Sequence, residues 1–112
     1  MQILYRQKRV QSLVERTVMD FVSRQTDPGT VVTVSRVALS PDLKNGTAFL
    51  LIYPETHARE MLATLQSCVS ELNRQLFKTL RMKTPPKVAF TLDAGERRRQ
   101  RIEEILRQEK KT

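Results

Sequence analysis

The sequence predicts an α+β fold with the element order α-β-β-α-β, followed by a charged tail. Two apolar patterns with a period of three to four residues, at residues 1–25 and 61–80, predict amphipathic helices. Three shorter segments, at residues 30–40, 47–53 and 87–92, have the composition or alternation of strands. A chain of 112 residues is the size of one domain, so we expect a single three-stranded sheet packed against helices.

The first helix is indicated by an apolar stripe along residues 10–21. Its members are Val10, Leu13, Val14, Thr17, Val18 and Phe21, which recur with the period of one helix face. The basic residues Arg6, Lys8 and Arg9 precede this stripe or lie off it. Pro28 and Gly29 then end the helix, because both residues favour turns over continued helix.

The next two segments predict a hairpin. Val32 and Val34 share one face of the first strand, whereas Val37 and Leu39 share the other. Either both faces are partly buried, or a bulge near residues 35–36 shifts the phase of the alternation. Turn residues at positions 40–46 connect this strand to the second, whose apolar run suits a central position in the sheet.

The second helix combines an apolar face with a basic second half. Its apolar positions are Met61, Leu62, Leu65, Val69, Leu72, Leu76 and Leu80. Periodicity alone predicts one continuous helix, with Thr56 as its N-cap. Pro85 and Pro86 stop helical geometry, because proline lacks a backbone N–H. The third strand follows with its apolar residues on alternate positions, and the sequence leaves open at which edge of the hairpin it is added.

We divide the chain into a domain of residues 1–93 and a basic tail of residues 94–112. Ile102, Ile105 and Leu106 form one narrow apolar stripe in the tail. Short isolated helices are marginal in water, and so narrow a stripe adds little packing. We therefore expect a flexible or weakly helical tail.

The distribution of charge favours a polyanionic partner. The formal net charge is +8, from 20 lysines and arginines against 12 acidic residues. Residues 1–25 carry five positive and two negative charges, and residues 70–92 carry five and one, whereas residues 26–69 carry three and four. The excess at the two helices and the following loop indicates a binding face rather than a uniform coat.

Aromatic side chains offer few candidates for stacking on nucleic-acid bases. Phe21, Phe49, Phe77 and Phe90 fall at apolar-face or strand-core positions, and Tyr5 and Tyr53 lie at the edges of elements. We therefore expect contacts of lysine and arginine with the backbone and shape of a nucleic acid.

The sequence contains no recognisable catalytic or metal-binding pattern. One histidine, His57, and one cysteine, Cys68, make neither a zinc site nor a convincing Cys–His pair. We expect His57 to be exposed, Cys68 to be a small buried hydrophobic residue, and Asp42 and Asp93 to make local hydrogen bonds near turns. No apolar run approaches the roughly 20 residues that span a bilayer. We expect no enzyme activity, no cofactor and no membrane partner.

Four stretches of the sequence, taken in order, carry a family likeness. They are Arg6-Gln7-Lys8-Arg9-Val10; Asp27-Pro28-Gly29 with the run from Val32 to Asn45; Leu72-Asn73-Arg74-Gln75-Leu76 leading into Leu80-Arg81-Met82-Lys83; and Pro86-Lys87-Val88-Ala89-Phe90-Thr91-Leu92-Asp93. Together they resemble bacterial ribosome-binding factor A across about residues 4–93. The resemblance implies a type II KH-like domain and a cytoplasmic factor that helps 16S rRNA mature. Such a factor binds free, immature small (30S) ribosomal subunits rather than 70S ribosomes, and it matters for growth in the cold.

The same resemblance implies a kink in the second helix. In the family an Ala-x-Gly turn makes this kink, and here the corresponding residues are Cys68, Val69 and Ser70. Asn73 also stands where the family usually has arginine.

From these observations we predict a monomeric, non-catalytic rRNA-binding factor. The predicted RNA-binding residues are Arg6, Lys8, Arg9, Ser70, Asn73, Arg74, Lys78, Arg81, Lys83 and Lys87. One alternative is a general basic DNA- or RNA-binding domain without ribosome specificity, although a hairpin separates the helices and leaves no helix-turn-helix. Another is a protein adapter that uses the apolar stripe of the tail as a partner helix.

Overall fold

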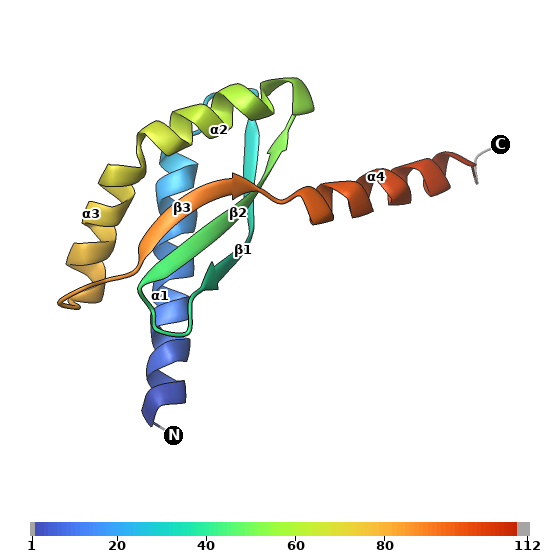
Figure 1. Ribbon diagram of the computed structural model, residues 1–112. Coiled ribbons are helices and arrows are strands. Elements are labelled where there is room, and N and C mark those ends of the chain that lie inside the picture. The colour runs from blue at the N-terminus through green and yellow to red at the C-terminus, as the bar shows by residue number, and fades with distance from the viewer. Residues whose placement is uncertain (1, 110–112) are drawn as a thin grey trace.

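The computed structural model describes the backbone of residues 2–109 and the side chains of residues 6–108. Its elements are α1 (Gln2–Gln25), β1 (Val31–Leu39), β2 (Asn45–Tyr53), a 3₁₀ turn η1 (Glu55–His57), α2 (Ala58–Ser67), α3 (Val69–Leu80), β3 (Lys87–Leu92) and α4 (Ala94–Glu109). The predicted α+β class and element order are confirmed, with the second helix in two pieces (Figure 1). Predictions at Met1, at the Tyr5 side chain and at residues 110–112 lie outside the described residues.

The sheet has the strand order β1-β2-β3, with β2 antiparallel to β1 and parallel to β3. The third strand is therefore added at the β2 edge of the hairpin. Helices α1, α2 and α3 lie on one side of the sheet, and α4 projects away from it (Figure 1). Fully buried side chains from the helices and from β2, such as Val14, Leu50, Leu65 and Leu72, fill the space between the layers.

A bulge in β1 resolves the imperfect alternation of that strand. The pairing with β2 shifts register between Val34 and Arg36, so Ser35 is the extra residue. Val34 is half-buried and Val37 is buried, which shows that the bulge returns the strand to the covered face. The Ser35 hydroxyl donates hydrogen bonds to the Phe49 carbonyl (3.1 Å) and to the Asp93 carboxylate (2.6 Å). Of the two alternatives that the sequence left open, the bulge is the correct one.

The prediction of one continuous helix is wrong, because the helix is interrupted at Cys68. This residue has φ −99° and ψ 6°, between α2 and α3. Its N–H bonds back only three residues, to the Leu65 carbonyl (3.0 Å), and the Ser67 hydroxyl donates to the Thr64 carbonyl (2.6 Å). A kink therefore forms here without glycine, where the hydrogen-bond ladder of the helix is interrupted. Cys68 itself is only half-buried.

The predicted N-cap at Thr56 is also wrong. Thr56 lies inside the 3₁₀ turn η1, and His57 occupies the N-cap position of α2 without a side-chain hydrogen bond. His57 is exposed, as expected, and its Nδ1 lies 3.3 Å from the Thr30 hydroxyl.

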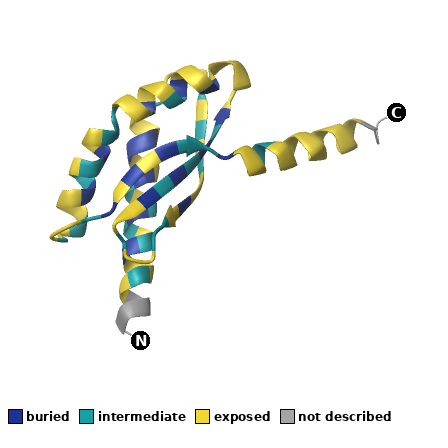
Figure 2. Ribbon diagram, in the orientation of Figure 1, coloured by how far each residue is buried: buried dark blue, intermediate teal, exposed yellow. Residues whose placement is uncertain are grey.

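The tail forms helix α4 over residues 94–109, where the sequence predicts a flexible or weakly helical segment. Its apolar stripe stays in solvent, since Ile102, Ile105 and Leu106 are each at least half exposed (Figure 2). Polar contacts tie its first turns to the domain instead. The Asp93 carboxylate accepts the Glu96 N–H (3.0 Å), and Arg101 makes a hydrogen-bonded ion pair with Glu55 (2.9 Å).

Candidate nucleic-acid interface

Three segments that are distant in the sequence meet at one end of the domain. The start of α1, the β1–β2 turn and the α3–β3 loop line an open groove of about 250 Å³. These three segments lie toward the lower end of the view in Figure 1. The Gln7 side-chain amide donates to the Pro41 carbonyl (3.3 Å), and the Lys87 N–H donates to the Lys44 carbonyl (3.0 Å). These contacts hold the three segments together.

Five exposed cationic residues lie on the segments that form this groove, and we call them the basic end. Arg6 and Lys44 line the groove itself. Arg81, Lys83 and Lys87 belong to the α3–β3 loop and its ends, next to the groove residues Met82 and Thr84 and the hairpin residue Asn45. Four of the five were predicted from the sequence in two separate groups, and the structure brings these groups together. Lys44 was missed, because it lies in the segment whose charges nearly cancel. Lys8 and Arg9 are both exposed on α1, two and three residues after Arg6 of the basic end.

The backbone conformation around the basic end is fixed by specific residues at the end of α3, at the start of β3 and in the hairpin turn. Arg81 ends α3 in the left-handed conformation (φ 52°), and the buried Pro86 fixes the start of β3. In the hairpin turn, the Asp42 carboxylate accepts hydrogen bonds from the Ser40 hydroxyl (2.6 Å) and the Lys44 N–H (3.0 Å). These bonds, the first of them most, hold the pKa of Asp42 below its ordinary value. Asp42 thus has the local role expected of it and keeps the turn in one conformation.

Three further predicted residues lie along the solvent-facing side of α3. Ser70, Arg74 and Lys78 are all exposed, and Arg74 lies 3.7 Å from the Glu71 carboxylate. Ser70 is in the first turn of the helix, about 16 Å along its axis from Arg81. The predicted residues therefore form an extended line from α3 into the basic end.

Asn73 occupies a different position from the other predicted residues. It is half-buried, and its Nδ2 donates to the Val69 carbonyl (3.1 Å) and the Val88 carbonyl (3.4 Å). Its Oδ1 accepts the Val88 N–H (3.0 Å). The Asn73 side chain joins α3 to β3, and we assign it to the fold rather than to a direct RNA contact.

Phe77 is not on the apolar face, and the expectation that it was is wrong. Its side chain is 56% exposed, whereas Leu72 and Leu76 are fully buried. Each residue turns a helix by about 100°, so the position after Leu76 rotates out of the core face. Phe21 and Phe90 do lie in the core, with ring centroids 6.4 Å apart.

Phe49 lies on the open face of the sheet. It is half-buried beneath Arg36, whose guanidinium carbon is 3.8 Å from the ring centroid. A cation over an aromatic face is a favourable contact, so this ring already has a partner within the domain.

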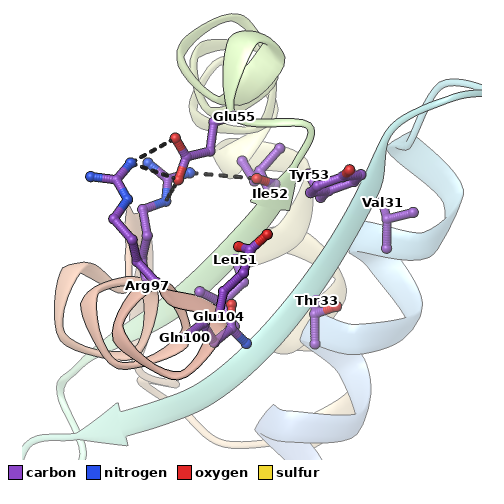
Figure 3. A pocket seen from close by; sticks show the side chains of 10 residues that line it. Val31, Thr33, Leu51, Ile52, Tyr53, Glu55, Arg97, Gln100 and Glu104 are labelled. Atoms are coloured by element: carbon purple, nitrogen blue, oxygen red, sulfur yellow. Dashed lines mark hydrogen bonds and ion pairs between the residues drawn. The ribbon is translucent and has the colours of Figure 1, made fainter. Parts of the chain in front are cut away.

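A second groove, of about 530 Å³, lies between the open face of the sheet and α4 (Figure 3). Val31, Leu51 and Tyr53 contribute apolar surface to it, and α4 contributes polar side chains. Glu55 faces Arg97 (3.7 Å) and Arg101 (2.9 Å) at its rim. Because these charges are matched internally, this groove is less suited to a polyanion than the basic end.

Neither a metal-binding cluster nor a membrane-spanning helix is found in the part of the chain that the structure describes. Among residues 2–109, no three histidine, cysteine, aspartate or glutamate side chains gather as metal ligands. The helices described have neither the length nor the apolar character needed to cross a membrane.

Residues 6–106 match the family model of ribosome-binding factor A. The sequence is similar to ribosome-binding factor A of Paracoccus denitrificans, with 38% identity over 93 residues, which cover 79% of this chain and 67% of that protein. The protein of that name from Anaeromyxobacter sp. strain K is 35% identical over 78 residues, 69% of this chain and 56% of its own. Ribosome-binding factor A of Rippkaea orientalis is 32% identical over 112 residues, which cover 96% of this chain and 88% of that protein. The aligned region thus spans little more than half of some relatives.

Two solved structures share the fold. The crystal structure of ribosome-binding factor A from Thermus thermophilus superposes with a TM-score of 0.65 at 21% identity, over 76% of this chain and 92% of that one. A homology model of the Thermus thermophilus protein, fitted into the cryo-EM map of its 30S complex, gives a TM-score of 0.62 at 22% identity, over 74% and 90%. The KH-like architecture predicted from the sequence agrees with these structures.

Proposed function

The chain belongs to the ribosome-binding factor A family, and from this premise we propose that it binds the small ribosomal subunit through the basic end. The Thermus thermophilus relative has been placed in the map of a 30S complex, which makes this subunit the first partner to test. We further propose that the protein acts as a cytoplasmic monomer on immature subunits rather than on 70S ribosomes. In this proposal it assists 16S rRNA maturation without catalysing a reaction.

The convergence of three segments on one cationic surface carries the proposal. Lysine and arginine contacts to phosphates supply most of the non-specific affinity for nucleic acid and fix a protein's position on it. Specificity for one ribosomal site would then come from the shape of the rRNA and from neighbouring ribosomal proteins, rather than from reading a base sequence.

The test is co-sedimentation of the wild type and of the double variant Arg81→Glu with Lys83→Glu. Each is mixed with isolated small subunits, with 70S ribosomes and with duplex DNA at one fixed salt concentration, because phosphate-driven affinity depends steeply on salt. We expect the wild type to travel with free small subunits and the variant to lose at least about tenfold in affinity, roughly the loss of one or two charged contacts. The thermal midpoint should barely change, since neither side chain is buried in the core.

A matched control distinguishes the effect of where the charges are changed from the effect of the change in net charge. The double variant Arg16→Glu with Arg59→Glu makes the same change in net charge at exposed positions of α1 and α2, outside the lining of the basic end. It should bind nearly as the wild type does. If both double variants lose affinity equally, or if duplex DNA binds as well as subunits, the general polyanion-binding alternative is correct. Normal co-sedimentation of the Arg81/Lys83 variant would remove the basic end as the site.

The alternative of an adapter helix is tested by deleting residues 94–112. Loss of subunit binding in this truncated protein, with the thermal midpoint retained, would move the interface to the tail.

The maturation role is tested in cells that lack the protein. We expect unprocessed 16S precursor to accumulate in the cold, and the Arg81/Lys83 variant to fail to reverse this.

A further inference from the structure

The exposed side of α3 places one aromatic ring within a row of cationic side chains. Ser70, Arg74, Phe77 and Lys78 lie at positions i, i+4, i+7 and i+8 of α3. At about 100° per residue, these four fall within a sector of about 100°. Leu72 and Leu76 are fully buried on the opposite side of the helix. The ring of Phe77 is therefore presented to solvent on the same side as Arg74 and Lys78, about one turn before Arg81 at the end of the helix.

We propose that Phe77 is a stacking platform for one unpaired base of RNA that runs along this side of α3. This inference rests on the proposed function and names a contact within it. Stacking on an aromatic ring is tolerant of base identity, because every base has a π-face. Arg74, Lys78 and Arg81 would contact the phosphates on either side of the stacked base.

The charges around Phe77 favour RNA over a protein partner. The neighbouring acidic residue on α3, Glu71, is already 3.7 Å from Arg74. An apolar protein surface that covered Phe77 would also have to desolvate the three cations beside it, which is costly unless each is paired. A comparably exposed apolar side chain, Met19 on α1 (57%), lies instead in mixed charge beside Glu15, Arg16 and Asp20.

The spacing of Arg74, Phe77 and Arg81 along α3 also suits a nucleic-acid strand. Arg74 and Arg81 are seven residues apart, about 10 Å along the helix axis, with Phe77 between them. The row then continues through Arg81 into Lys83 of the basic end. A strand that contacts the basic end can therefore extend along α3, whose one acidic residue, Glu71, is paired with Arg74.

The absence of tryptophan from the sequence allows a direct test. The variant Phe77→Trp provides a single fluorescent reporter, and Met19→Trp provides a matched control at an equally exposed position. Each is titrated with a single-stranded oligoribonucleotide and with an RNA duplex of the same length at one low, fixed salt concentration. We expect the single strand to quench the fluorescence of Phe77→Trp more strongly than the duplex does, and to leave Met19→Trp nearly unchanged.

Affinity gives the second measurement. Phe77→Ala should weaken binding of the single-stranded oligoribonucleotide and of small subunits by about 5-fold to 100-fold, the range for losing one stacked base. Phe77→Tyr should bind nearly as the wild type does, and Met19→Ala should have no effect. The far-UV circular dichroism of Phe77→Ala should match that of the wild type, because the ring is outside the core.

The outcomes distinguish this inference from the proposed function. If Phe77→Ala binds RNA and subunits normally, the stacking contact is refuted and the small-subunit proposal stands. If Phe77→Ala loses subunit binding while RNA fails to quench Phe77→Trp, the ring contacts a protein of the subunit, which also refutes stacking. If RNA quenches Phe77→Trp but the wild type shows no preference for subunits, stacking stands and the proposed function fails.

Discussion

Replacing Asn73 by alanine tests whether this side chain supports the fold or contacts RNA. The most valuable of its hydrogen bonds is that from the Val88 N–H to Oδ1 (3.0 Å), because Val88 is 2% exposed. The bond to Val69 adds less, since that carbonyl belongs to the same helix, and the bond to the Val88 carbonyl is long at 3.4 Å. Leaving a buried N–H without a partner costs about 1–3 kcal/mol. We therefore expect the free energy of unfolding to fall by about 2 kcal/mol.

Urea unfolding followed by far-UV circular dichroism measures this loss. For a domain of this size, about 2 kcal/mol corresponds to a fall of roughly 8 °C in the thermal midpoint. Lys78→Ala on the exposed side of α3 is the control, and it should change stability by less than about 0.5 kcal/mol. Asn73→Asp should do no better than alanine, because it retains the acceptor but places a charged oxygen against two carbonyls.

Binding completes the test of Asn73. At a temperature where Asn73→Ala is folded, its affinity for small subunits should remain within about threefold of the wild type, a change of about 0.6 kcal/mol. If Asn73→Ala instead unfolds like Lys78→Ala and loses subunit binding, the assignment to the fold is wrong and the sequence-based prediction of an RNA contact is correct.

Two more predictions concern the attachment of α4. The Ser35 hydroxyl and, after it, the Glu96 N–H lower the pKa of Asp93, and the charge of Arg36 adds to this. The ionised carboxylate therefore stabilises the fold at pH values above its ordinary pKa of 3.8. This stabilisation is lost as the pH falls through the lower pKa of the folded state. The difference in urea midpoint between the wild type and Asp93→Asn should therefore be constant above about pH 5 and shrink in stronger acid. Glu55→Gln should speed tryptic cleavage within α4 while changing global stability by less than about 1 kcal/mol, because its ion pairs are half exposed; unchanged cleavage would show that these pairs do not hold the helix.

The fold was predictable where local patterns decide it. The apolar stripe of α1 and the phase shift in β1 are visible in consecutive residues, so the first helix could be inferred and the bulge at Ser35 was one of two alternatives. The break at Cys68 could not be inferred from periodicity, because cysteine and serine both occur within ordinary helices. The break accompanies the packing of both half-helices against β3, a tertiary contact that no local pattern reveals. The edge chosen by β3 was equally inaccessible, since both edges of a hairpin offer the same backbone groups.

The site was predictable in its charges but not in its assembly. Counting charges located the start of α1 and the α3–β3 loop, and it overlooked Lys44 in a nearly neutral hairpin. Parallel pairing places Asn45 opposite Lys87, which brings the hairpin turn to the end of the sheet where β3 begins. Phe77 was assigned to the apolar face because it is aromatic. Its position one residue after the buried Leu76, about 100° around the helix, already places it off that face. The role of Asn73 needed the position of the Val88 N–H, which no local pattern in α3 reveals.

The three kinds of residue on and beside α3 act through different physical terms, and these terms respond differently to salt. The phosphate contacts that we propose for Arg81 and Lys83 would release counterions, so the affinity that they supply would fall as salt rises. The stacking that we propose on Phe77 involves no net charge, so its share of the affinity would be far less sensitive to salt. Asn73 supports both terms indirectly, because its bonds to Val88 fix the orientation of α3 against β3. The salt dependence of binding in the Phe77→Ala and Arg81/Lys83 variants thus separates a stacked base from general attraction to a polyanion, which affinity at a single salt concentration cannot do.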